Sequence, residues 1–222
     1  MTILPIEIHP ENQSYEINVS DSSYFSIEKI RDRPRFSSPH ITGQQYLSDS
    51  PSQALLQETY SKIGWTLIQF QLLEKALKSL LPFINPDGSK KGVEGLDKYK
   101  SAISDKTLGP VFGEFNKSIS VETKDSIQDD FLEKYLQNIS ARRNDLVHHL
   151  LKMPGMSLDS SIGCNNINSY LDGCIDDIEN MKALLKPIAR HIAENNKYAE
   201  YDEAGLLKET IDLTLSIKLE IE

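Results

Sequence analysis

The chain has few cysteines, and this scarcity excludes two classes of protein: those stabilised by several disulfides and those stabilised by a metal bound to cysteines. Only Cys164 and Cys174 occur among its 222 residues. Two thiols are too few for a disulfide framework or for a metal cage built from cysteine. Because unpaired cysteines are usually interior, we expect both side chains to be buried.

Positive charge is also scarce. The chain has 24 basic residues against 33 acidic ones, which gives a formal net charge of −9. A protein that coats nucleic acid non-specifically carries a broad basic surface and gains affinity by releasing counterions. The composition therefore disfavours a coating protein, and any RNA that binds must enter a local site.

Long apolar runs are missing as well. No run approaches the roughly 20 residues that span a bilayer. The first residues, MTILPIEIHPENQ, have no basic leader followed by a long apolar stretch, so we expect no secretion signal. These features predict a cytoplasmic protein without a membrane-spanning segment.

What is present is typical of a globular protein, with 39% hydrophobic and 26% charged residues. Three regions are expected: 1–50, 51–200 and 201–222. In the first, Ile6 and Ile8, and then Tyr15, Ile17 and Val19, alternate with polar residues, as in half-buried strands. A Ser/Pro-rich connector follows these strands.

The middle region predicts a mainly α fold. Helical patterns bounded by Pro and Gly cover 51–81, 94–104, 107–118, 125–152 and 165–197. Ser50 caps the first helix and Pro82 ends it, because proline cannot continue a helix. Met153-Pro154-Gly155 ends the fourth.

The last region carries six apolar residues that alternate strictly with polar ones: Ile211, Leu213, Leu215, Ile217, Leu219 and Ile221. On a helix they would scatter, whereas on a strand they form one face. We expect a strand here rather than a helix. It would pair with the N-terminal strands to form a small β appendage.

Two charged residues interrupt the apolar faces of the long helices. Glu74 lies within the apolar stripe of the first helix, which comprises Leu56, Tyr60, Ile63, Leu67, Phe70, Leu77 and Leu81. Arg143 falls within about 20° of Leu132 and Leu150, on the apolar face of the helix at 125–152. Burying an unpaired charge costs several kcal/mol. We therefore expect Glu74 to pair with Arg143; the alternative is that each side chain extends to solvent.

Arg143 begins a cluster of side chains of the types that catalyse reactions. The cluster lies within the run Ala141-Arg-Arg-Asn-Asp-Leu-Val-His-His149. Asn144 and His148 are four apart and share a helix face. Imidazole can take or give a proton near neutrality, and guanidinium can hold a phosphate as its charge builds. An Arg and a His on one helix are most often structural, however. His148-His149 is a poor metal site, because no matching acidic or His cluster accompanies it.

Arg143-Asn144-x-x-x-His148 resembles the signature of HEPN domains, which is Arg, commonly a polar residue, and then His after four to six positions. The context is also similar: a long helix with an internal acidic residue (Trp65-x8-Glu74), a variable middle, and the motif near the end of another long helix. The resemblance spans roughly 53–153, with 165–197 as the closing helix. It implies a HEPN-like up-and-down helical bundle.

The resemblance also implies a function. Many HEPN proteins are homodimers in which two motifs form one composite, metal-independent endoribonuclease site that needs no cofactor. Many act as toxins or in phage defence, restrained by an inhibitory partner protein. Arg143 and His148 carry over as catalytic, Asn144 as the supporting polar residue and Glu74 as the acidic helix position. Arg142 and His149 are alternatives in register.

One departure concerns regulation. HEPN toxins silenced by a nucleotidyltransferase partner often carry Tyr two residues after the His, and this chain has Leu150 there.

Three hypotheses remain: an endoribonuclease, a non-catalytic HEPN-like module that recruits a partner protein or nucleotide, and a purely structural helical protein. The Arg–His pair favours the first, and the acidic charge favours the second.

Overall fold

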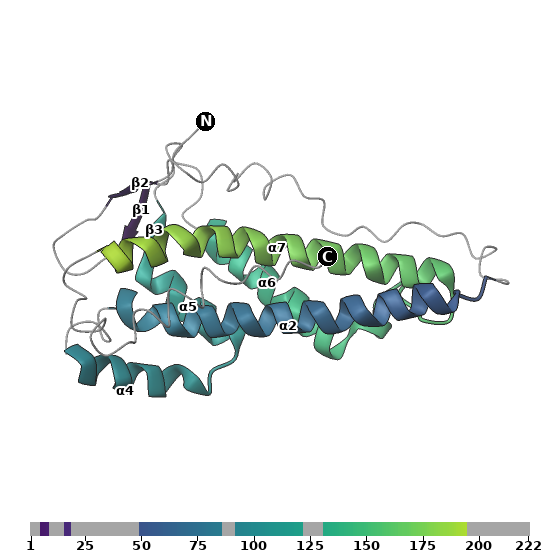
Figure 1. Cartoon of the computed structure of the whole chain (residues 1–222), viewed down its shortest axis with the longest axis horizontal. Coiled ribbons are helices and arrows are strands. Elements are labelled where there is room, and N and C mark those ends of the chain that lie inside the picture. The colour runs from purple at the N-terminus through teal and green to yellow at the C-terminus, as the bar shows by residue number, and fades with distance from the viewer. Residues whose placement is uncertain (1–4, 9–15, 19–48, 86–91, 122–130, 195–222) are drawn as a thin grey trace. The chain divides into compact units, whose positions relative to one another are not determined.

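The computed structural model describes residues 5–8, 16–18, 49–85, 92–121 and 131–194 of the chain. These residues are mainly helical (Figure 1). The helices are α2 (Gln53–Ile84), α4 (Gly92–Ser104), α5 (Leu108–Ser118), α6 (Phe131–His148) and α7 (Ser161–Glu194), with a short 3-10 helix η1 (Leu150–Lys152). None of the described helices combines the length and the apolar surface required to cross a membrane. The mainly α prediction is confirmed.

Strands occupy part of the N-terminal region. β1 (Pro5–Ile8) pairs antiparallel with β2 (Glu16–Asn18) on one side and with β3 (Ile119–Val121) on the other, in the order β2-β1-β3. Ile6 stands opposite Ile17 and Val121. The pairing expected between the N-terminal strands and the segment 201–222 lies outside the described residues, as do residues 31–48 of the connector expected at 31–52.

The chain divides into two compact units. Unit 1 comprises 1–25, 72–138 and 180–222, and unit 2 comprises 26–71 and 139–179. The core of unit 1 is apolar, with Leu77 and Leu80 of α2, Leu96 of α4, Phe115 of α5 and Ile188 of α7 fully buried. Since α4 and α5 lie almost where the sequence places them, the helical pattern of the middle region is confirmed.

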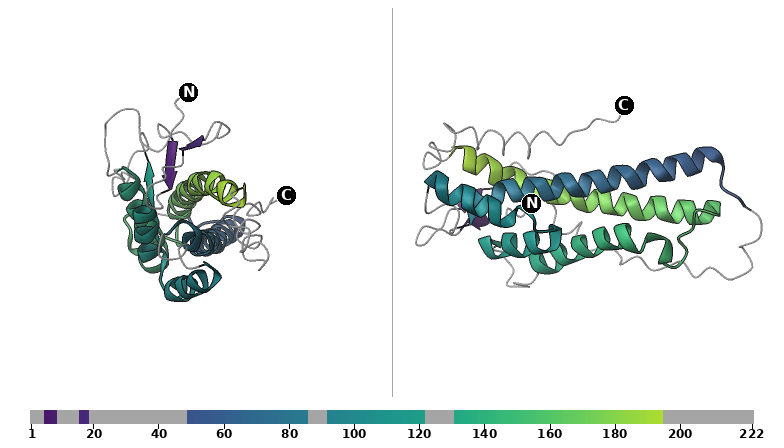
Figure 2. Two further views of the ribbon diagram at one scale, coloured as in Figure 1. Left: turned by 90° about the vertical axis from the view of Figure 1, so that its left-hand side faces the viewer. Right: turned by 90° about the horizontal axis from the view of Figure 1, so that it is seen from below.

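Unit 2 packs three helical segments side by side (Figures 1 and 2). The segments of α2 and α7 run in the same direction, and that of α6 runs opposite to them. Lys62 of α2 donates to Asp172 of α7 at 3.0 Å, and Tyr170 of α7 donates to a backbone oxygen of α6 at 3.1 Å. Cys164 and Cys174 are both fully buried free thiols, as predicted.

Several helix ends differ from the prediction. α2 begins at Gln53, and the Ser52 hydroxyl, rather than Ser50, accepts from Leu55 N–H at 3.2 Å and caps it. α2 continues past Leu81 to Ile84, with Pro82 inside it. Proline removes only the bond to the Lys78 carbonyl, and the helical bond from Asn85 N–H to Leu81 O, at 2.8 Å, is present beyond it. α7 begins at Ser161 rather than 165, because the Ser160 hydroxyl accepts from Gly163 N–H at 3.1 Å and caps the helix. α6 ends at His148, and its expected start at 125 lies outside the described residues.

Candidate functional site

The last two turns of α6 carry the Arg–Asn–His motif. His148 is the final residue of the helix, and His149 N–H still donates to Asp145 O at 2.8 Å. The chain then tightens into η1 and turns at Gly155, whose φ of 76° suits glycine. The motif therefore stands where a rigid helix meets a short loop, all within unit 2.

Arg142 is held inside unit 2. Its Nη1 lies 3.1 Å from Asp177 Oδ2 of α7, in an ion pair whose side chains are 19% and 6% exposed. Tyr170 donates its hydroxyl to the Arg142 carbonyl at 3.1 Å. Since this guanidinium compensates a buried carboxylate, Arg142 is a packing residue.

Gly173 makes room for that ion pair. A Cβ at this position of α7 would lie 2.9 Å from Arg142 Nη1. Glycine is unfavourable inside a helix, by about 1 kcal/mol relative to alanine, so its place here has a packing reason. The guanidinium lies against the bare backbone of α7.

Arg143 has a different environment. It is half-buried, and its Nη1 donates to Oδ1 of the exposed Asn144 at 3.2 Å. A guanidinium has five N–H donors, and among the described residues only this bond occupies one of them, which leaves several for a ligand. Asn144 therefore orients Arg143 without consuming its binding capacity, as a supporting polar residue would.

The two histidines are both exposed to solvent. Their ring centroids lie 6.0 Å apart, with the ring planes inclined by 58°. Exposed imidazoles can exchange protons with water and reach a bound substrate. The geometry gives access to His148 and His149 alike, so exposure alone does not choose between them.

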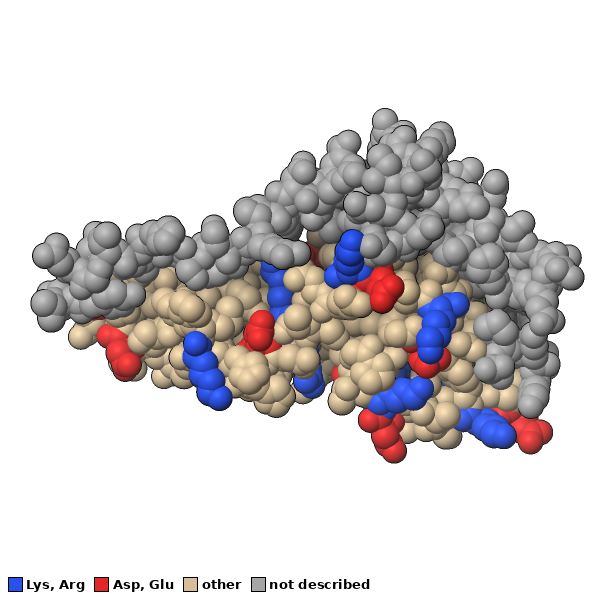
Figure 3. Space-filling view, turned by 180° about the vertical axis from the view of Figure 1, so that it is seen from behind, with Lys and Arg blue, Asp and Glu red and all other residues tan. Residues whose placement is uncertain are grey.

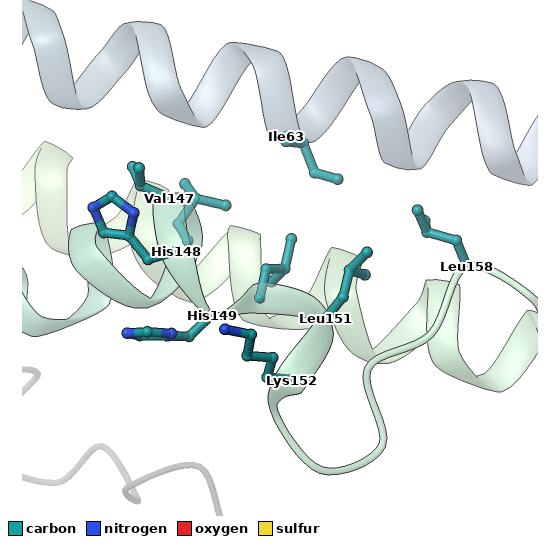
Figure 4. A pocket seen from close by; sticks show the side chains of 9 residues that line it. Ile63, Val147, His148, His149, Leu151, Lys152 and Leu158 are labelled. Atoms are coloured by element: carbon teal, nitrogen blue, oxygen red, sulfur yellow. The ribbon is translucent and has the colours of Figure 1, made fainter.

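A shallow pocket of about 330 Å³ adjoins the motif (Figure 4). Its wall consists of Ile63 of α2, residues 146–152 and Leu158. Leu146 and Leu150 are buried and form part of the core, whereas Val147 and Leu151 are 42% and 57% exposed. His148 thus stands beside an open, mostly apolar hollow.

Glu74 forms an ion pair that the sequence analysis does not name. Its carboxylate accepts from Lys78 Nζ at 2.8 Å, one turn further along α2, and Lys78 also donates to Ser104 O at 2.7 Å. The charge of Glu74 is therefore compensated within its own helix, and the Lys78 side chain fastens α4 to α2. Glu74 lies in unit 1 and the motif in unit 2, so its expected pairing with Arg143 stays a prediction.

Burial changes the acidity of two groups behind the motif. Burial raises the pKa of the Cys174 thiol from 9.0 to about 12, although the Arg142 guanidinium opposes the shift. Burial also raises the pKa of the Tyr170 hydroxyl. Both groups stay protonated at neutral pH, so neither supplies a nucleophile or a base.

Sequence reasoning missed Asp177, Tyr170 and Gly173. A signal for Asp177 exists, since this carboxylate lies among the apolar positions Cys174, Ile178 and Met181 of α7. It is the same kind of signal that singled out Arg143. No sequence pattern predicts which arginine pairs with Asp177. Arg142 and Arg143 are adjacent, and only the rotation of α6 determines which of the two faces α7.

Among the described residues, no group of three or more His, Cys, Asp or Glu is arranged to hold a metal ion. On the face of the molecule drawn in Figure 3, basic and acidic side chains are interspersed rather than gathered by sign. Comparison of the chain with protein-family models, with curated proteins and with solved structures finds no match.

Proposed function

We propose that this protein is a metal-independent endoribonuclease of the HEPN type. The observation that carries the proposal is the contrast between the two arginines of the motif. Arg142 is consumed by a buried ion pair, whereas Arg143, Asn144 and His148 remain accessible at the end of one helix. An accessible arginine beside an accessible histidine is the pair of groups that metal-free RNA cleavage uses.

The proposed chemistry needs only these side chains and a ribose. One imidazole removes the proton of the 2′-hydroxyl, whose oxygen attacks the adjacent phosphorus. Arg143 holds the phosphate and stabilises the charge that develops on its oxygens. A second imidazole protonates the departing 5′-oxygen, which leaves a 2′,3′-cyclic phosphate and a 5′-hydroxyl.

Because the reaction uses a base and an acid, the site contains two copies of His148, one from each protomer of a homodimer. The chain then folds as a HEPN-like up-and-down bundle with a β appendage and acts in the cytoplasm. Its role is that of a toxin or phage-defence effector, held inactive by an inhibitory partner protein.

The test is incubation of the purified full chain with total RNA in the presence of EDTA. We expect cleavage to persist in EDTA, to leave 2′,3′-cyclic phosphate ends, and to fail on DNA, which lacks the 2′-hydroxyl. Mass spectrometry of the fragments identifies the ends.

Matched variants assign the residues. Arg143→Ala and His148→Ala should each abolish cutting with the fold preserved, while His149→Ala should cost much less. The variant carrying both Arg143→Ala and His148→Ala should be little less active than either single variant, because the two residues act as one unit. Full cleavage activity of the His148→Ala variant would reject the assignment. Loss of the wild-type activity in EDTA would reject it as well.

A second candidate function is a non-catalytic HEPN-like module that recruits a partner protein or nucleotide. The exposed apolar side chains of Val147 and Leu151 beside the motif favour it, as does the net charge of −9. This module would bind its partner but leave RNA intact, so the same incubation separates the two functions.

A further inference from the structure

The pocket beside His148 has two chemically different sides (Figure 4). The side chains of Ile63, Leu151 and Leu158 lie on one side, and the nitrogen atoms of His148, His149 and Lys152 lie on the other. Lys152 is exposed and has no ion-pair partner among the residues that the structure describes. An apolar wall facing a cationic edge suits a ligand with a flat, weakly polar part and an anionic part.

The size of the pocket limits that ligand. At about 330 Å³ it lies at the lower end of the range of about 300–1,000 Å³ for small-molecule sites. One nucleotide unit has suitable dimensions, whereas an RNA duplex does not present a free base to such a hollow. Only an unpaired base, turned out of a single strand, can contact the apolar wall.

We propose that this pocket is a base-binding subsite for single-stranded RNA, an inference that rests on the proposed function of the same site. The base lies against Ile63 and Leu151 and stacks on the ring of His149. Lys152 contacts the phosphate on the outer side of that nucleotide. Since His148 also lines the pocket, the nucleotide held here is the one next to the cleaved bond.

Electrostatics explain why a cation is needed at this place. The last residues of α6 line the pocket, and the C-terminal end of a helix carries partial negative charge that repels a phosphate. The chain as a whole is acidic. Lys152 supplies the local positive charge that offsets both, and it makes the subsite sensitive to salt.

The test measures binding without cleavage. The full chain carrying His148→Ala is titrated into a short fluorescein-labelled single-stranded RNA, and fluorescence anisotropy gives the affinity. In that background, Leu151→Ser and Lys152→Gln should each weaken binding on the order of tenfold. Lys152→Gln should also lower the slope of log affinity against log salt by about 0.7, the value for one phosphate on a single strand.

Two control variants match these changes outside the pocket. Ile68→Ser removes an exposed apolar side chain of α2, and Lys98→Gln removes an exposed cation of α4. Both should bind the RNA as the parent does, and all four variants should keep the circular dichroism of the parent. Equal affinity in Leu151→Ser, Lys152→Gln and the controls would overturn the subsite.

Cleavage by the chain with His148 intact distinguishes the two proposals. If it cuts no RNA while the pocket variants still bind more weakly, the nuclease assignment is wrong and the subsite stands. If it cuts RNA, and Leu151→Ser and Lys152→Gln cut the same sequences at the same rate, the nuclease stands and the subsite is wrong. Equal binding of duplex and single-stranded RNA would also reject the subsite.

Discussion

Arg142 and Arg143 are adjacent in the sequence, but the rotation of one helix gives their side chains opposite roles. Arg142 turns toward α7 and compensates Asp177. Arg143, about 100° further round the helix, donates to the exposed Asn144. A buried ion pair contributes little net stability, but removal of one partner is costly. Arg142 thereby fixes the rotation of α6, on which the exposure of Arg143 depends.

The thiol of Cys174, in the same buried cluster, predicts a loss of stability in alkali. The unfolded chain releases this proton near its ordinary pKa of 9.0, whereas the folded chain retains it up to about 12. The folded state binds more protons in this window, so the free energy of unfolding falls as pH rises. The stabilising contribution is complete below about pH 9 and is lost progressively up to about pH 12.

Urea unfolding at several pH values tests this prediction. For one proton, the slope cannot exceed about 1.4 kcal/mol per pH unit. Cys174→Ala removes the titrating group, so its stability should fall less steeply with pH than that of wild type, whatever the cost of the cavity. Part of the slope should remain, because the pKa of Tyr170 is raised as well. Equal slopes for the two proteins would contradict the shift.

At the scale of the element, the approach of α6 to α7 depends on Gly173. Gly173→Ala adds a Cβ 2.9 Å from Arg142 Nη1 and displaces the guanidinium from Asp177. The gain in helix propensity, about 1 kcal/mol, is then offset by the strained ion pair. We expect the variant to be no more stable than wild type and less stable if Arg142 cannot shift.

Gly64 of α2 is the matched control, since a Cβ there meets nothing within 4 Å. Gly64→Ala should raise the free energy of unfolding by about 0.5–1 kcal/mol through helix propensity alone. Thermal melts of the two variants beside wild type make the comparison. A Gly173→Ala protein as stabilised as Gly64→Ala would show that the ion pair tolerates the extra methyl group.

The helices themselves follow from the sequence pattern, but their buried faces follow only in part. The stripe predicted for α2 is correct at Phe70, Leu77 and Leu81, whereas Tyr60 is 53% exposed. In that half of the helix the buried positions include Thr59. Its hydroxyl donates a hydrogen bond to Leu55 O at 2.8 Å, so this polar group has a partner within its own helix. Hydrophobic spacing cannot reveal a polar residue that is buried with its own hydrogen bond.

The same limit applies to the candidate site. The sequence indicates that Glu74 and Arg143 are charges on apolar faces, but pairing depends on the reach and rotation of each side chain. Lys78, one turn from Glu74, forms an i,i+4 pair with it. Arg143 stays half-exposed beside Asn144. Spacing thus identified the charged positions, and three-dimensional packing decided which charges meet.

At the scale of the whole molecule, the proposed mechanism requires more than one chain. One motif provides a single His148, which cannot act as base and acid in the same step. We therefore expect a homodimer with a two-fold axis passing close to the motif. Light scattering at micromolar concentration measures the oligomeric state, and a strict monomer would contradict the composite site.

Mixing two forms of the chain tests whether both copies of His148 act together. Inactive His148→Ala protein is added in equal amount to a fixed amount of wild type, and the subunits are allowed to exchange. Half of the wild-type chains then sit beside an inactive partner, so activity should fall to about half if each site needs both histidines. The control adds the same inactive protein immediately before the assay, with no time for exchange. Activity that stays unchanged after full exchange would mean that each chain cuts RNA on its own, since its partner's histidine would then be dispensable.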